Sequence, residues 1–102
     1  MDRFAMLKEI LTQNPQDSFA RYGLAMEYAN RGEVETALAE FSKLLELNPD
    51  YTAAYQMVAQ TLMKAGRSQE ARDKLEAGIA CAARTGNAHA RAEMEALLDE
   101  LR

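Results

Sequence analysis

The chain has 102 residues, of which 48% are hydrophobic and 27% are charged, and its formal net charge is −4 at pH 7. A chain of this length forms one domain and leaves little room for a large catalytic cleft. The acidic balance argues against nucleic-acid binding, which needs a clustered excess of Lys and Arg.

The single cysteine and the hydropathy pattern indicate in which cellular compartment the protein is expected. Cys81 has no second cysteine with which to form an intrachain disulfide, and this fits a reducing cytoplasm. The sequence contains no stretch of about 18 uncharged apolar residues. We therefore expect no signal peptide and no membrane span, and the sequence predicts a cytoplasmic protein without membrane partners.

The first predicted helix covers residues 3–13 and has a wide apolar arc. At ~100° per residue the arc spans roughly 160°, which is more than packing against one neighbour usually needs. Either the arc contacts both helices of the next pair, or part of it mediates a two-fold homodimer. The candidates for such an oligomer contact are Phe4, Met6 and Ile10.

Two copies of a longer unit follow, at about residues 18–51 and 52–85. Several residues of the first copy return 34 positions later in the second. Asn14-Pro15, Gly32, Ala25 and Ala37 return as Asn48-Pro49, Gly66, Ala59 and Ala71. A period of this length indicates that one supersecondary unit is repeated.

Each copy has the pattern of a helix, a turn and a second helix. Apolar residues with helical spacing lead up to Gly32, and the same spacing resumes after it. Gly32 and Gly66 stand where a helix ends in a left-handed residue, a conformation that favours glycine. Asp17 and Asp50 are expected to cap the helices that follow.

A closing helix is predicted over residues 87–101. It follows the turn Thr85-Gly86-Asn87, and Asn87 is expected to be its cap. Its apolar residues form a narrow arc and are Met94, Leu97, Leu98 and Leu101. Charged residues surround this arc, so we expect the closing helix to seal the C-terminal end of the repeat array.

The repeated residues resemble the pattern of the tetratricopeptide-repeat (TPR) family. The matching residues are Leu24, Ala25, Tyr28, Ala37, Phe41 and Pro49. Arg21 departs from the pattern, because the family has a large aromatic residue there, which Tyr55 restores in the second unit. The resemblance implies an all-α fold, a right-handed α-solenoid of antiparallel helix pairs with about six helices. One TPR domain would then span residues 1–102, with a half-unit helix at 3–13, two repeats and a capping helix.

The resemblance also implies a concave groove, lined by the first helix of each pair, that binds a peptide segment of a partner protein. The peptide-groove candidates are Phe19, Tyr22, Met26, Asn30, Gln56, Gln60, Met63 and Lys64. Tyr22, Met26 and Gln60 stand where chaperone-tail adaptors need a Lys and two Asn. We therefore expect a segment that inserts an apolar side chain near Tyr22 and Met26. The alternative is that Phe19 and Tyr22 pack between helices.

Only one group of residues resembles a catalytic site, namely Cys81 with His89 and Glu93. A nucleophilic cysteine needs a base within hydrogen-bond distance and an oxyanion site, and the sequence has no Gly-rich turn to supply the latter. Cys81 aligns with Leu47 in the repeat, so we expect a buried packing residue. One Cys and one His are too few ligands for a zinc site.

The sequence thus predicts an interaction scaffold or adaptor that is not an enzyme and has no metal and no cofactor. Its partner is expected to be a protein or peptide, with no nucleic acid and no membrane involved. The alternative function is a structural homo-oligomerisation module that associates, for example as a homodimer, through the helix at residues 3–13.

Overall fold

The computed structural model describes residues 2–102. Within these residues the chain forms six α-helices and no strand. The helices are α1 (Arg3–Gln13), α2 (Ser18–Asn30), α3 (Val34–Leu47), α4 (Thr52–Lys64), α5 (Ser68–Thr85) and α6 (Ala88–Glu100). The predicted all-α fold with about six helices is confirmed. No helix in this described part of the chain is long and apolar enough to cross a membrane.

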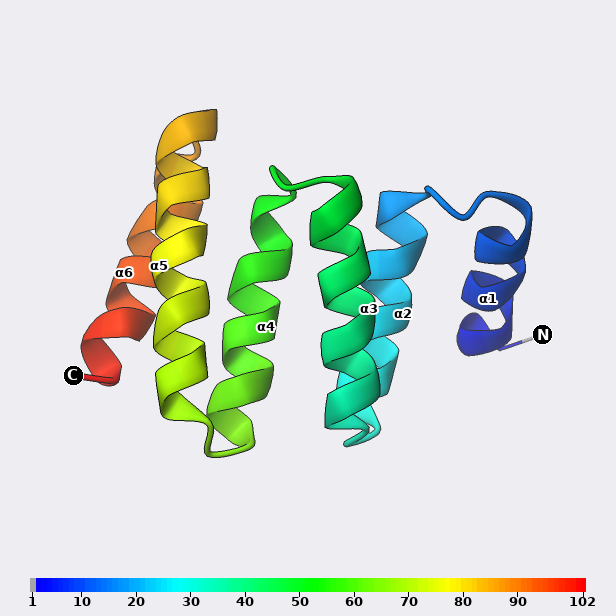
Figure 1. Ribbon diagram of the computed structural model, residues 1–102, viewed down its shortest axis with the longest axis horizontal. Helices are drawn as coiled ribbons and strands as arrows, with labels where there is room; N and C mark the ends of the chain where they lie inside the picture. Colours follow the sequence, from blue (N-terminus) through cyan, green and yellow to red (C-terminus); the bar gives the residue numbers. More distant parts are fainter. Residues whose placement is uncertain (1) are drawn as a thin grey trace. The chain divides into compact units, whose positions relative to one another are not determined.

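The chain forms two compact units, Met1–Asn48 and Pro49–Arg102. In the first unit, α2 packs against both α1 and α3 (Figure 1). In the second unit, α5 packs against both α4 and α6, and α4 also contacts α6. The helices α4 and α6 form the two walls of a groove.

Local signals fix most of the helix ends. Asp17 accepts a hydrogen bond from the backbone N–H of Ala20 at 2.9 Å, and Asn87 accepts one from Ala90 at 3.1 Å. Both residues are the predicted N-caps, and they satisfy backbone donors that have no partner within the helix. Gly32 has the predicted left-handed conformation, with φ 78°.

The expectation that Asp50 caps a helix is wrong. The residue before α4 is Tyr51, and its side chain makes no capping hydrogen bond. The carboxylate of Asp50 instead accepts hydrogen bonds from the guanidinium of Arg84, at 2.8 Å from Nη2. A bond to Arg is charge-assisted and stronger than a neutral one, so the tertiary contact replaces the local cap.

In the first unit, α1 uses only part of its apolar arc for packing. Leu7 is buried with Leu24 of α2, and Phe4 packs against the same cluster. The Phe4 ring also stacks edge-to-face with Tyr28, with ring centroids 5.2 Å apart. The side chains of Met6 and Ile10 remain 50% and 40% exposed. Phe4 therefore belongs to the core of its own unit, whereas the other two oligomer-contact candidates are accessible.

The start of each helix pair is held to the preceding segment through one backbone carbonyl. In the first unit Arg21 donates from Nη2 to the carbonyl oxygen of Pro15 at 2.9 Å. In the second unit the hydroxyl of Tyr55 donates to the carbonyl oxygen of Pro49 at 2.8 Å. Arg21, the departure from the family pattern, thus makes the same kind of contact as Tyr55, the aromatic residue 34 positions later.

Arg21 also forms a largely buried ion pair with Glu40 of α3. Its Nη1 lies 2.6 Å from Oε2 of Glu40, and the two side chains are only 12% and 15% exposed. The Nε of Arg21 is buried and has no hydrogen-bond partner among residues 2–102. This pair joins α2 to α3 across the interior of the first unit.

The core of the second unit depends on a close approach of three helices at Gly78. The buried cluster includes Leu75 of α5 and Met94 and Leu98 of α6, with Tyr55 of α4 packed against it. A Cβ atom on Gly78 would lie 2.6 Å from the Cβ of Tyr55 and closer still to the sulfur of Met94. The absence of a side chain at Gly78 allows α4, α5 and α6 to meet.

Candidate functional site

A shallow groove lies between α4 and α6, within the second unit. Its cavity volume is about 280 Å³. The lining residues are Gln56 and Gln60 of α4 and Glu93, Ala96, Leu97 and Glu100 of α6. We call this feature the α4/α6 groove. One wall carries amides, the other carries carboxylates, and small apolar side chains contribute to the α6 wall.

The polar groups of the α4/α6 groove are partly engaged with one another. Gln56 donates from Nε2 to Oε2 of Glu93 at 3.3 Å, which is a long hydrogen bond. The other oxygen of Glu93 lies 2.6 Å from Nε2 of His89, whose side chain is 86% exposed. Glu100 forms no ion pair with any residue that the structure describes.

The structure brings together some of the predicted groove residues of the second unit. Gln56 and Gln60 line the α4/α6 groove. Met63 is half-buried and Lys64 is exposed at the end of α4, and neither belongs to the lining. The α6 wall was not predicted, because the closing helix was expected only to seal the end of the repeat array. The available signal was the spacing of Glu93 and Glu100, which places them on one helix face.

In the first unit, the candidate residues lie along α2. Phe19 is 73% exposed, Tyr22 and Met26 are half-buried, and Asn30 is exposed at the end of the helix. The Tyr22 ring packs against Phe41 of α3, with centroids 6.3 Å apart. Packing between helices therefore accounts for part of the Tyr22 side chain, whereas the structure leaves Phe19 open to solvent.

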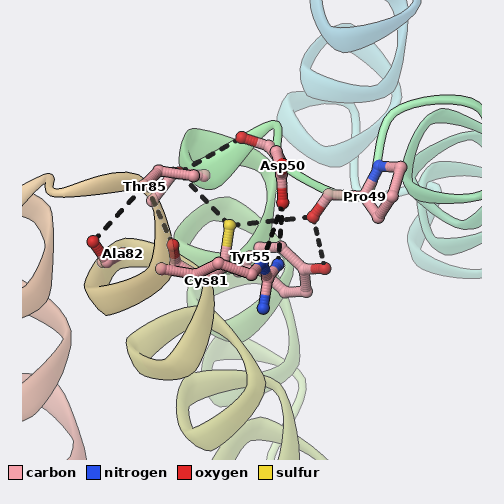
Figure 2. Close-up of polar contacts among 8 residues, drawn as sticks. Pro49, Asp50, Tyr55, Cys81, Ala82 and Thr85 are labelled. Atoms are coloured by element: carbon pink, nitrogen blue, oxygen red, sulfur yellow. Dashed lines mark hydrogen bonds and ion pairs between the residues drawn. The ribbon is translucent and has the colours of Figure 1, made fainter.

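Cys81 lies in a polar network at one end of the α4–α5 pair (Figure 2). Its side chain is fully buried, and its sulfur is 3.3 Å from the hydroxyl of Thr52 and 3.7 Å from the carbonyl oxygen of Pro49. His89, by contrast, is exposed and pairs with Glu93. Cys81 is therefore buried, as predicted, and the hydrogen-bond partners of its sulfur are Thr52 and Pro49, not His89 or Glu93.

Two pKa values are shifted in this network. Burial, with a smaller contribution from Cys81, raises the pKa of the Tyr55 hydroxyl. The hydrogen bond to Asp50 raises the pKa of Arg84, which keeps that guanidinium charged. Both shifts favour the protonated forms of Tyr55 and Arg84, which are the forms that donate the observed hydrogen bonds. Among residues 2–102, no three His, Cys, Asp or Glu side chains are placed to hold a metal ion together.

Successive antiparallel helix pairs, with a 34-residue period in the sequence, define a helical-repeat protein. The tetratricopeptide-repeat family model matches residues 28–98. A TPR repeat-containing protein of Pseudomonas aeruginosa is 30% identical over 95 residues, which cover 93% of this chain and 90% of the relative. The chain therefore belongs to the tetratricopeptide-repeat family, a non-catalytic protein-interaction fold.

Solved structures agree with this assignment. A protein of Bordetella parapertussis superimposes with a TM-score of 0.86 at 26% identity, covering 99% of this chain and 88% of that one. The TPR2B domain of yeast Sti1, solved as a complex with pHsp70, gives a TM-score of 0.88 and covers 96% of this chain and 78% of that one. At 20% identity the yeast domain shows similarity of fold alone.

Proposed function

We propose that this protein is an adaptor that binds an extended segment of a partner protein in the α4/α6 groove. The observation that supports the proposal is the lining of this groove, with two glutamines opposite two glutamates and apolar side chains beside them. A glutamine side chain offers both a donor and an acceptor. It can therefore pair with the N–H and C=O groups that an extended peptide leaves free.

The exposed face of α2 is proposed as a second contact surface, for an apolar side chain of the partner. Phe19 is 73% exposed and provides a large apolar area with few rotatable bonds. Met26 is half-buried on the same helix, and a thioether adapts readily to different shapes. Tyr22 and Asn30 complete the face.

The fold supports a protein partner, because the yeast domain that shares it was solved as a complex with pHsp70. The lining of the α4/α6 groove does not carry the Lys and Asn clamp of the chaperone-tail adaptors, so we propose a different ligand. The acidic balance and the single cysteine support a cytoplasmic protein that binds neither nucleic acid nor membranes.

Removing both groove amides is expected to abolish most of the binding. A ligand segment is first selected on a peptide array, and its affinity is then measured by fluorescence anisotropy. The double variant Gln56→Ala, Gln60→Ala should bind at least about tenfold more weakly, because each lost hydrogen bond contributes about 1 kcal/mol. The control is Gln69→Ala, an exposed glutamine on α5. Unchanged affinity in the double variant, with an unchanged helical circular dichroism spectrum, would refute the groove assignment.

A second candidate function is homo-oligomerisation through α1. The observation that favours it is the exposure of Met6 and Ile10, at 50% and 40%, beside a helix face that is already buried. If this function is correct, light scattering should give a mass above one chain that falls to one chain in Ile10→Glu. Ala5→Glu, an exposed position elsewhere on α1, is the control. A mass of one chain at every concentration, in all three proteins, would rule this function out.

A further inference from the structure

The charge of the α4/α6 groove is unbalanced. Of its six described lining residues, Glu93 and Glu100 are acidic and none is basic. Oppositely charged groups attract, and like charges placed together at an interface are costly. An acidic segment is therefore disfavoured in this groove, and a segment with positive charges is favoured.

The spacing of the two carboxylates sets the spacing of those positive charges. Glu93 and Glu100 are seven residues apart on α6, so they lie on one face about 10 Å apart along the helix axis. A polyproline II segment advances about 3.1 Å per residue and has three residues per turn. Residues three positions apart in such a segment lie on one side, separated by about 9 Å.

The present partners of Glu93 can be exchanged for those of a ligand. Its bond from Gln56 is long, at 3.3 Å, and its other partner, His89, is almost fully exposed. An arginine of the ligand can donate two parallel hydrogen bonds to a carboxylate, which neither present partner does. Gln56 would then be free to bind the ligand backbone.

We infer that the α4/α6 groove selects a basic segment with two Arg or Lys residues three positions apart and a small apolar residue between them. The inference rests on the proposed function, because it specifies the ligand of the same groove. The carboxylates bind the two basic side chains, the glutamines bind the backbone between them, and the apolar residue contacts Ala96 and Leu97.

The probes are fluorescein-labelled synthetic peptides in an extended Pro-containing sequence. One peptide has two arginines three positions apart, a second has two glutamates instead, and a third has the two arginines adjacent. Fluorescence anisotropy should show binding of the first peptide at least about tenfold tighter than the second. The first should also bind more tightly than the third, and raising the salt concentration should weaken its binding.

Variants of the protein assign the effect to the groove. Glu93→Gln and Glu100→Gln should each weaken binding of the first peptide by about threefold, as expected for partly exposed charge pairs. Glu95→Gln is the matched control, because Glu95 is an exposed carboxylate on α6 outside the groove lining. His89→Ala should leave the binding unchanged or tighten it.

The results separate this inference from the proposed function. Equal binding of the basic and acidic peptides, no detectable binding of the basic peptide, or no effect of Glu93→Gln and Glu100→Gln would overturn the inference. The proposed function stands in that case if an array-selected segment without basic residues still requires Gln56 and Gln60. It fails as well if no selected segment requires them.

Discussion

Replacing Gly78 with alanine is expected to destabilise the protein by about 2 kcal/mol, against the usual trend. In a helix interior, alanine is normally about 1 kcal/mol more favourable than glycine. Here the new methyl group would lie 2.6 Å from the Cβ of Tyr55. That atom is fixed by the backbone of α4 and cannot rotate away, so α4 and α5 must separate at the expected cost of overpacking.

Urea unfolding followed by circular dichroism measures this effect as a change in the free energy of unfolding. The matched control is Gly23→Ala on α2. There a new Cβ would meet only the side-chain ends of Leu7 and Arg3, at 3.2 to 3.3 Å. Those ends can move, so the gain in helix propensity should offset the crowding to within about 1 kcal/mol. Equal effects of the two substitutions would show that the close approach at Gly78 does not limit stability.

Removing the guanidinium of Arg21 is expected to lower the free energy of unfolding by about 3 kcal/mol. Arg21→Ala leaves the carboxylate of Glu40, which is only 15% exposed, with the exposed amine of Lys43 at 4.0 Å as its remaining ion-pair partner among residues 2–102. A largely buried charge that loses its main partner typically costs about this much. The substitution also removes the hydrogen bond to the carbonyl of Pro15. Chemical denaturation is again the measurement, with Arg91→Ala, which breaks an exposed ion pair with Glu95, as the control.

A double substitution tests whether the buried carboxylate of Glu40 causes the loss of stability in Arg21→Ala. In the second unit Tyr55 and Lys74 stand 34 positions after Arg21 and Glu40. Arg21→Tyr with Glu40→Lys copies that pair into the first unit, removes the largely buried carboxylate and supplies a hydroxyl for the carbonyl of Pro15. It should restore more than half of the stability that Arg21→Ala loses. If Arg21→Ala lowers the free energy of unfolding by less than about 1 kcal/mol, water stabilises the Glu40 carboxylate nearly as well as Arg21 does, and the explanation is wrong.

The helix ends were predictable from the sequence, because they depend on local chemistry. Asp17 and Asn87 cap their helices as expected, and Gly32 and Gly66 take the expected left-handed conformation. Asp50 failed as a cap because its carboxylate binds Arg84, 34 positions further along the chain. Rules based on neighbouring residues cannot detect that competition. The boundaries of the two sequence repeats, at residues 18–51 and 52–85, stay a prediction.

The candidate site was only half predictable, for a related reason. Positions in the repeat indicated Gln56 and Gln60 on α4, and both line the groove. The opposite wall depends on which face α6 turns toward α4, and the apolar arc of α6 indicates only which face is buried. The exposure of Phe19 and the burial of part of Tyr22 depend likewise on the packing of α2 against α3.

The carbonyls of Pro15 and Pro49 have a consequence for how this repeat can diverge. Both accept a hydrogen bond from the following helix, one from a guanidinium and the other from a phenol. What recurs through the array is an acceptor on the main chain, which no substitution removes. The donor can be any long side chain with a polar end, so this position can vary during evolution while its architectural role is inherited. A comparison that scores side-chain identity counts Arg21 as a mismatch, although its bond to the main chain is equivalent to the one that Tyr55 makes 34 positions later.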